Sequence, residues 1–342
     1  MIQVNSKSSI NMNLQQIQAI CAVTRHRYNM SAAAKTLGRS QSVLSRQVKA
    51  LELEVGTRIF VRTRNKVVGL TPEGQRVHRI GERVLLDLKS LGQIGEENSP
   101  EAGGELRIAT THVHARYLLP GAIKSFNARF PSIALTLQQC DPGQCRDMIS
   151  AGEAEIGIIT MATRTEAPIV TIPAYRIPRC VIAPKGHPLT RVSNLTLKDL
   201  ANYPLVAYPS TFSGRTIVEE AFVSAGIKPR IVCSATDADV CKTYVELGMG
   251  VAILATVAFD PTTDRGLVAM DAGHLFRPGV LNLVFRKHGI LTRPLESFVT
   301  LFAPHVPRDL MRAAMEGAAF DRNHLIREAP VALGGEFRSP TL

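Results

Sequence analysis

The hydrophobic pattern near the N-terminus predicts three helices. The first is marked by apolar residues that recur at helical spacing: Leu14, Ile17, Ile20, Cys21 and Val23. Ser31 can cap a second helix over 32–37, which is rich in alanine, and Ser40 can cap a third over 41–53. Gly38 supplies the turn between these two helices. Two helices joined by a short glycine-containing turn form the helix-turn-helix layout.

The third helix has two chemically different faces. Its core-facing positions are apolar: Val43, Leu44, Val48 and Leu51. Its outer face carries short hydroxyls, an amide and cations: Gln41, Ser42, Ser45, Arg46 and Lys49. Such groups read base edges and phosphates when a helix lies in the major groove. A solvated surface helix is the alternative interpretation of the same residues.

The segment that follows favours DNA binding over a merely solvated surface. Residues 58–70 predict two short strands around a basic turn, which is the pattern of a wing. Arg62, Arg64 and Lys66 are placed there for phosphate or minor-groove contact. The predicted DNA-binding set is therefore Ser31, Ser40, Gln41, Ser42, Ser45, Arg46, Lys49, Arg62, Arg64 and Lys66.

A long helix follows the wing. Thr71 as N-cap, Pro72 at the first helical position and Glu73 in the first turn predict its start, and it runs to about Ile94. One side carries an apolar seam: Val77, Ile80, Val84, Leu88 and Leu91. The seam can pack within its own domain or form a dimer interface, and we favour the dimer.

A polar, glycine-containing segment, 95–104, marks a domain boundary, after which strands and helices alternate. The expected strands are 105–109, 133–138, 156–160, 205–208, 230–233, 251–254 and 281–285, and the expected helices are 116–130, 144–151, 216–225, 237–247 and 293–302. This alternation predicts mainly parallel sheets flanked by helices. Two such α/β units joined by extended segments predict a hinged pair of subdomains with a ligand cleft between them.

Two strand ends carry candidate ligand-binding groups. One is the segment with Thr110, Thr111, Val113 and His114, and the other is the segment with Thr211 and Ser213. Thr160 ends a third strand. Hydroxyls and free backbone N–H groups at helix starts favour an anion such as a carboxylate or sulfate. Simple capping of the two helices is the alternative.

Charge is distributed unevenly along the chain. Of the 342 residues, the first 92 contain 15 lysines and arginines against 5 acidic residues, a net charge of +10. The rest contain 25 against 24, a net charge of +1. A basic module joined to a neutral partner is typical of polyanion binding.

Several functional classes find no support in the sequence. The six cysteines form no C-x-x-C pair, which indicates reduced thiols in a cytoplasmic protein, although redox sensing by Cys140 and Cys145 stays open. His112 and His114 lack further ligands at a spacing suited to zinc, so we expect neither a metal nor another cofactor. No catalytic motif, signal peptide or membrane-spanning apolar run is present, so we expect no enzyme activity and no membrane partner.

The N-terminal segment SAAAKTLGRSQSVLSRQVKALELEVGTRIFVRT, with the later LTPEGQ, resembles the signature of LysR-type transcriptional regulators. The segments IATTHVHARYLLPGAIKSF, STFSGRT and ATDADVCKTYVELGMGVAILA resemble the CysB-like branch of that family, which regulates sulfur assimilation and cysteine biosynthesis.

The resemblance implies an α/β fold class. It comprises an N-terminal winged helix-turn-helix with a long linker helix, then a two-subdomain, periplasmic-binding-protein-like α/β effector domain. We expect the DNA-binding domain over 1–71, the linker and hinge over 72–103, the effector domain over 104–320 and a flexible tail over 321–342. Within the effector domain, the first subdomain should comprise about 104–175 and 280–320, and the second about 176–279.

The resemblance also implies a homotetramer that binds promoter DNA and RNA polymerase, with an acetylated serine as inducer and sulfate-like anions as competitors. Thr111, Thr160 and Ser213 keep hydroxyls in the effector site, whereas Val113 and His114 replace the usual threonine and glutamine. His114 is expected to become cationic near neutral pH beside an anion. The effector is therefore expected to be an anion of the acetylserine, sulfate, thiosulfate or sulfonate class.

Three alternatives remain open. The chain could be a LysR-type regulator with an unrelated small anionic effector. It could also be a solute-binding protein, which the missing signal peptide and basic N-terminal module disfavour. An α/β enzyme with an incidental helix-turn-helix is disfavoured because no catalytic constellation is present.

Overall fold

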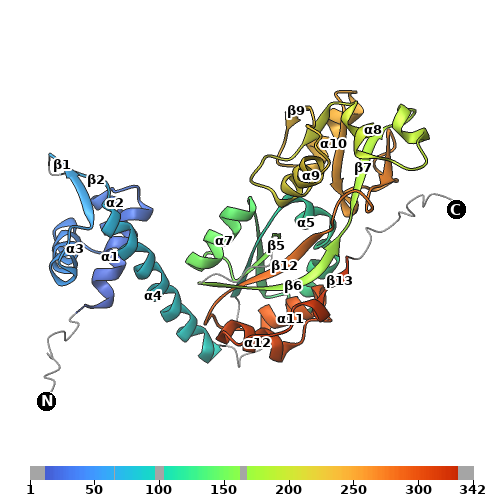
Figure 1. Ribbon diagram of the computed structural model, residues 1–342. Helices are drawn as coiled ribbons and strands as arrows, with labels where there is room; N and C mark the ends of the chain where they lie inside the picture. The colour runs from blue at the N-terminus through green and yellow to red at the C-terminus, as the bar shows by residue number, and fades with distance from the viewer. Residues whose placement is uncertain (1–11, 65, 97–103, 162–167, 330–342) are drawn as a thin grey trace, which may run out of the picture. The chain divides into compact units, whose positions relative to one another are not determined.

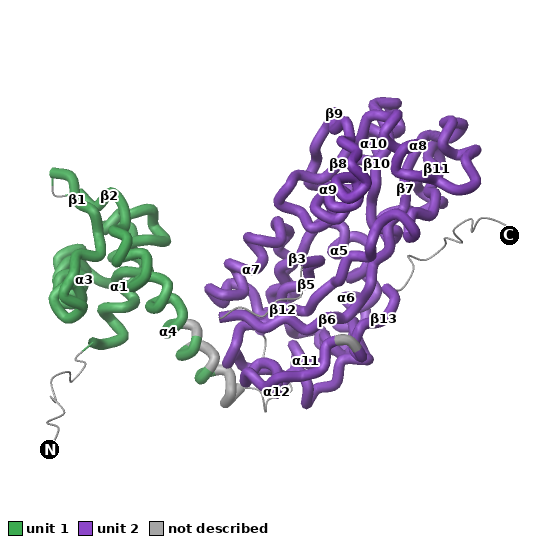
Figure 2. The backbone as a smooth tube through the Cα atoms, viewed as in Figure 1, with its two compact units in different colours: residues 1–98 green, residues 99–342 purple. Residues whose placement is uncertain are grey.

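The computed structural model describes residues 12–64, 66–96, 104–161 and 168–329 (Figure 1). The chain forms two compact units, residues 1–98 and 99–342 (Figure 2). The segment 97–103, predicted to form a hinge, lies outside the described residues, as do residues 330–342.

The first unit is a winged helix-turn-helix, as predicted. Its elements are α1 (Leu14–Arg25), α2 (Met30–Thr36), α3 (Gln41–Val55), β1 (Phe60–Thr63), β2 (Lys66–Leu70) and α4 (Pro72–Glu96). Ile20, Leu44, Val48 and Leu51 are fully buried between the first three helices. The strands β1 and β2 pair antiparallel, and Thr63 opposes Lys66 across the turn.

The helix caps confirm one prediction and correct another. Ser40 caps α3 by accepting a 3.3 Å hydrogen bond from the Val43 N–H. The cap of α2 is Asn29, whose side chain accepts from the Ala32 N–H at 3.0 Å, so the assignment of this cap to Ser31 was wrong. Asparagine caps a helix as well as serine does, and α2 therefore begins two positions earlier than expected.

The helix α4 begins as predicted and packs on the wing. The Thr71 hydroxyl accepts a 2.9 Å hydrogen bond from the Gly74 N–H. Gly74 lies so close to the backbone of Ile59 that an added Cβ would be 1.9 Å from its carbonyl oxygen. Further along α4, three apolar side chains are exposed: Ile80, Leu88 and Leu91.

The second unit contains two mixed sheets. The first has the order β13-β6-β12-β5-β3-β4, and the second β11-β7-β10-β8-β9. The strands of the first are β3 (Gly104–Thr110), β4 (Ile133–Gln139), β5 (Ile156–Thr160), β6 (Ile169–Ile177), β12 (Gly279–Arg286) and β13 (Arg327–Glu328). The strands of the second are β7 (Arg179–Pro184), β8 (Leu205–Ala207), β9 (Ile231–Ser234), β10 (Val251–Ala255) and β11 (Leu267–Asp271).

The expectation of mainly parallel sheets was wrong. The strand β12 runs antiparallel to β5 and β6, and β7 runs antiparallel to β10 and β11. The chain passes directly from β6 into β7 and later returns from β11 to β12, so each sheet receives strands that do not belong to a βαβ unit. The α/β character itself holds, because β3, β4 and β5 pair in parallel, as do β8, β9 and β10.

Helices cover these sheets (Figure 1). They are α5 (His112–Tyr117), α6 (Pro120–Arg129), α7 (Pro142–Ala151), α8 (Leu197–Ala201), α9 (Ser213–Ser224), α10 (Ala238–Glu246), α11 (Arg293–Phe302) and α12 (Arg308–Glu316), with short 3-10 turns at Pro188–Arg191, Thr256–Ala258 and Asn323–Leu325. The helix expected over 116–130 is divided into α5 and α6 ahead of Pro120, because proline lacks the N–H that would continue the first helix.

The tail predicted to be flexible from residue 321 is partly wrong. Arg327 and Glu328 form β13, which pairs in parallel with β6 opposite Tyr175 and Arg176. Leu325 is buried in the same core as β6. These backbone hydrogen bonds and this apolar contact attach residues 325–328 to the edge of the first sheet.

Candidate DNA-binding face and effector cavity

The outer face of α3 is exposed, as predicted. Gln41, Ser42, Arg46 and Lys49 are exposed and Ser45 is half-buried, while Leu44, Val48 and Leu51 hold the helix on the core. The helix is amphipathic because its apolar positions recur every three or four residues. The cations and hydroxyls therefore share the surface that points away from the domain.

Hydrogen bonds fix the start of this face. The Ser31 hydroxyl donates to the Gln41 side-chain oxygen at 2.9 Å, which connects α2 with α3. Arg39, in the turn between them, donates to the Gln47 side-chain oxygen at 2.7 Å. Arg39 is half-buried, and it was not among the predicted DNA contacts.

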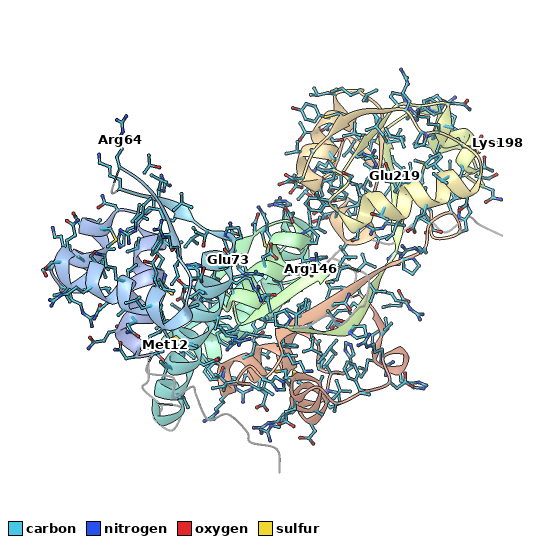
Figure 3. All side chains as sticks on the ribbon, turned by 60° about the vertical axis from the view of Figure 1, so that its left-hand side comes forward. Met12, Arg64, Glu73, Arg146, Lys198 and Glu219 are labelled. Atoms are coloured by element: carbon cyan, nitrogen blue, oxygen red, sulfur yellow. A yellow bond between two sulfur atoms is a disulfide. The ribbon has the colours of Figure 1, made fainter. Side chains whose placement is uncertain are left out.

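The wing presents its predicted cations to solvent. Arg62, Arg64 and Lys66 are all exposed, and Figure 3 shows Arg64 projecting from the turn between β1 and β2. Arg64 has a left-handed φ of 47°. The Glu52 carboxylate accepts hydrogen bonds from the Ile59 and Phe60 N–H groups, at 2.9 and 3.2 Å. Glu52 therefore holds the first wing strand at the end of α3.

A cavity in the second unit lies where strands of both sheets end. Its lining residues follow β3, β4, β8 or β9, end β5 or β10, or begin β7. Most of them are polar or aromatic: Thr111, His112, Val113, His114, Pro142, Thr160, Arg179, Tyr208, Phe212, Ser213, Gly214, Thr236 and Ala255. Its empty volume is about 440 Å³, including open solvent. This is the position at which ligands bind in open α/β sheets.

Five of the seven predicted effector residues line the cavity: Thr111, Val113, His114, Thr160 and Ser213. Thr110 does not, because its side chain is fully buried and its hydroxyl donates to the Ile158 carbonyl at 2.7 Å. Thr211 does not line the cavity either, and it is exposed. The structure therefore does not bring Thr110 and Thr211 into the cavity. Thr110 faces the core because successive side chains of a strand point to opposite sides, and Thr211 lies in the exposed turn before α9.

His114 is a buried, neutral histidine. Its Nδ1 lies 3.1 Å from the Ile158 carbonyl and 2.9 Å from the Thr111 hydroxyl, and its Nε2 lies 3.0 Å from the Thr160 hydroxyl. A carbonyl oxygen can only accept, so we assign the proton to Nδ1 and let Nε2 accept from Thr160.

Burial, together with the nearby Arg179, lowers the pKa of His114 to about 4, against an opposing hydrogen bond to the Ile158 carbonyl. In this structure His114 is therefore neutral near pH 7, and the expectation that an adjacent anion makes it cationic stays a prediction. The charge of the cavity comes from another residue.

That residue is Arg179, the first residue of β7. It is 4% exposed, and among the described residues no carboxylate forms an ion pair with it and its Nε has no hydrogen-bond partner. Burial lowers the pKa of Arg179. A buried guanidinium without a counter-ion is unfavourable, so this site favours an anion.

Three further donors without partners belong to residues that line the cavity. The Tyr208 hydroxyl is buried and has no hydrogen-bond partner within the described ranges. The N-terminus of α9 lacks a side-chain cap, which leaves the Ser213 and Gly214 N–H groups for a ligand. Neither Arg179 nor Tyr208 was predicted. The available sequence signal was an arginine within the apolar run 169–184, because charged residues are seldom buried without a purpose. That run contains two arginines, and only Arg179 is buried, whereas Arg176 is exposed.

An ion-pair network joins the two sheets beside the cavity. His112 contacts Asp237 at 3.0 Å and Asp239 at 2.9 Å, and the Tyr117 hydroxyl donates to Asp239 at 2.5 Å. Lys242 donates to the Tyr117 hydroxyl at 2.9 Å. Although burial opposes it, hydrogen bonds from Tyr117, His112 and Lys242 lower the pKa of Asp239 to about 2. We call these five residues the latch.

The sequence predicted no metal site, and three residues of the latch are potential metal ligands. His112, Asp237 and Asp239 have ligand atoms within 4.8 Å of one another, as do Cys21, His78 and Glu82 in the first unit. Lys242 and Arg116 already neutralise Asp239, and Arg25 pairs with Glu82. His112 and His114 point to different partners and do not form a site together.

The prediction of reduced cysteines was wrong for one pair. Cys140 and Cys145 are joined by a disulfide, while Cys21, Cys180, Cys233 and Cys241 are free. Both paired cysteines flank the start of α7, where the backbone turn brings their Cα atoms to 5.9 Å.

Comparisons with known proteins agree with this architecture. Residues 14–75 match the "Bacterial regulatory helix-turn-helix protein, lysR family" and residues 99–307 the "LysR substrate binding domain". The HTH-type transcriptional regulator SsuR of Burkholderia cenocepacia is 42% identical over 86% of this chain and 96% of its own. The regulator CysB of the same organism is 38% identical over 90% and 98%, and the regulator cbl of Escherichia coli 34% over 90% and 98%.

Solved structures show the same fold. The cofactor-binding domain of the Cbl transcriptional regulator has a TM-score of 0.60 at 34% identity, and covers 64% of this chain and 96% of that one. Full-length CbnR complexed with its target DNA has a TM-score of 0.60 at 21% identity, and covers 85% and 99%. Within the described residues, no helix combines the length and the apolar character needed to cross a bilayer. With its helix-turn-helix and its substrate-binding domain both matched, the chain belongs to the LysR family of bacterial transcriptional regulators.

Proposed function

We propose that this regulator responds to a small oxyanion that binds in the cavity, and that it controls genes of sulfur assimilation, cysteine biosynthesis or sulfonate use. The observation that carries the proposal is Arg179, a buried cation at the cavity that has no carboxylate partner in the described part of the chain. Sulfate, thiosulfate, sulfonates and the carboxylate of acetylserine share the chemistry that such a site selects. The similarity to SsuR and CysB supports the sulfur-related members of this group.

The DNA side of the proposal uses α3 and the wing. Arg46 and Lys49 on α3, with Arg64 on the wing, supply exposed cations for promoter DNA, and their surroundings carry the net positive charge of the N-terminal segment. The exposed apolar residues of α4, Ile80, Leu88 and Leu91, support self-association through this helix into a dimer and then a tetramer. A cytoplasmic location and contact with RNA polymerase complete the proposal.

Thermal unfolding of the full-length protein tests the effector. We expect acetylserine, sulfate, thiosulfate or a simple sulfonate to raise the midpoint, by the equivalent of about 2.7 kcal/mol at 100 times its Kd. The same ligand at the same concentration should give a much smaller shift with Arg179→Met. No shift of the wild-type protein with any of these anions would contradict an oxyanion effector and would leave the family assignment untouched.

A further inference from the structure

The disulfide between Cys140 and Cys145 encloses a short loop at the start of α7. Cys140 directly follows β4, and Cys145 lies in the first turns of the helix. Asp141, between them, caps the helix by accepting from the Gly143 and Gln144 N–H groups at 2.8 and 2.9 Å. The helix start therefore has its own hydrogen bonds, and the fold of this loop does not depend on the disulfide alone.

The enclosed loop is part of the cavity wall. Pro142, next to Asp141, lines the cavity together with Thr111. The Cys140 N–H donates to the Thr110 carbonyl at 2.9 Å, directly before Thr111 in sequence. The loop that the disulfide closes is thus connected to the effector cavity at two places, through Pro142 and through the backbone next to Thr111.

The two sulfurs differ in access. Cys145 is fully buried, whereas Cys140 is half-buried. Burial raises the pKa of the free thiols of Cys180 and Cys241 to about 12, so these two are poor nucleophiles. Because Cys140 is half-buried and Cys145 is fully buried, a soluble oxidant or reductant would reach the pair through Cys140.

We propose that Cys140 and Cys145 are a site of reversible thiol oxidation, and that their state adjusts the affinity of the adjacent cavity for its effector. The second half of this inference rests on the proposed function. The oxidant class is a low-molecular-weight disulfide. The bridged form holds Pro142 in the wall, and the reduced form releases that restraint and binds the effector more weakly.

The reaction is a pair of thiol–disulfide exchanges. The Cys140 thiolate attacks one sulfur of the small disulfide, forms a mixed disulfide and releases one small thiolate. The Cys145 thiolate then attacks the Cys140 sulfur, forms the Cys140–Cys145 bond and releases the second small thiolate. The protein loses two electrons and two thiol protons, and the small disulfide becomes two thiols.

The first test measures the bond itself in the full-length protein. The protein is equilibrated in glutathione buffers from fully reduced to fully oxidised, free thiols are alkylated, and mass spectrometry determines the bridged fraction. We expect the pair to open in reduced glutathione and to close again in oxidised glutathione. A pair that stays bridged in the first buffer, or stays open in the second, overturns the proposal.

The second test measures the link to the cavity, with sulfate as the probe. We expect sulfate to bind the reduced wild-type protein about fivefold or more weakly than the bridged protein. Cys140→Ser should show the weaker affinity in both buffers, and Cys233→Ser, at a half-buried cysteine of β9, should keep the difference. Equal affinities of both wild-type forms overturn the link.

Failure of the effector proposal can be told apart from failure of this one. If sulfate binds neither the bridged nor the reduced protein, sulfate is refuted as an effector. Amide hydrogen exchange then tests whether the Cys140–Cys145 bond restrains the loop. We expect residues 139–146 to exchange faster in the reduced than in the bridged wild-type protein. The same exchange in both forms overturns the proposal.

Discussion

The Ser213 hydroxyl donates a 2.8 Å hydrogen bond to the main-chain carbonyl of Thr160. Ser213 begins α9, a helix of the subdomain that contains the second sheet. Thr160 is the last residue of β5 in the first sheet. The hydroxyl of the same Thr160 lies 3.0 Å from Nε2 of His114. One residue therefore contacts both halves of the effector domain at the cavity, which makes the cavity and the relative placement of the sheets interdependent.

Arg179→Met is expected to weaken sulfate binding by about 2–3 kcal/mol, since it removes the buried charge and its donors. Titration calorimetry measures the change, and Arg191→Met, at an exposed arginine, is the matched control.

Because His114 has a pKa of about 4, the affinity of the wild-type protein for sulfate should stay constant between about pH 5.5 and 8. If the affinity for sulfate falls as the pH rises through 6.5, His114 carries a positive charge in the complex and the assignment of the charge to Arg179 alone is wrong.

His114 should make the stability of the effector domain depend on pH. Its pKa is lowered from 6.5 to about 4 on folding, so the unfolded chain binds a proton in this range and the folded chain does not. The contribution of neutral His114 to the free energy of unfolding is therefore fully present above pH 6.5. It is lost as the pH falls towards 4, and the loss amounts to about 3 kcal/mol. Urea unfolding across this range measures the loss. His114→Gln should remove most of it, and an unchanged pH dependence in that variant would contradict the assignment.

Arg46→Ala should reduce the affinity for the specific operator by about 1–3 kcal/mol if Arg46 contacts a base. Lys49→Ala, one turn along the same exposed face, is the comparison for a phosphate contact. Fluorescence anisotropy with operator and unrelated DNA separates the two roles. A uniform loss on both DNAs for Arg46→Ala would assign it to the phosphates instead.

Gly74→Ala is expected to destabilise the DNA-binding unit by about 1–3 kcal/mol. The new Cβ would lie 1.9 Å from the Ile59 carbonyl oxygen, which is backbone and cannot turn away. Gly92→Ala on the same helix has nothing within 4 Å and should be neutral or stabilising. Chemical denaturation compares the variants, and equal stability of both would show that α4 can shift away from the wing.

Tyr117→Phe should lower the free energy of unfolding of the effector domain by about 1–2 kcal/mol, because Lys242 and Asp239 each lose a hydrogen bond. Lys242 is 4% exposed, so water replaces the hydroxyl poorly. Tyr244→Phe, at an exposed tyrosine on the same helix as Lys242, is the control. A loss of the same size in both variants would argue against the latch.

The sequence predicted those parts of the molecule whose signal is local. The apolar positions of α3 and the basic turn of the wing depend on helical and hairpin geometry, and both are observed. Cap assignment was less certain because Asn29 and Ser31 are both good caps and only packing selects between them. In the same way, the sequence could not show which of the neighbouring residues Thr110 and Thr111 lines the cavity. Packing buries Thr110 and leaves Thr111 in the cavity wall.

Residues brought together by long-range contacts escaped prediction. Arg179 reaches the cavity only because the chain changes sheets at Pro178, and Tyr208 only because β8 ends beside it. The Cys140–Cys145 disulfide depends on how β4 turns into α7, which cysteine spacing does not specify. The pKa of His114 likewise reflects complete burial, which no single residue type indicates.

The two chain segments that join the sheets touch each other at the cavity. An added Cβ at Gly279, where the chain returns into β12, would lie 2.8 Å from the guanidinium of Arg179 and 2.7 Å from the methyl group of Thr160. A genetic selection for regulators with an altered response to the effector should accordingly recover substitutions at residue 279. Such alleles would carry no altered DNA contact, and their phenotype would arise from side-chain volume between the two connections.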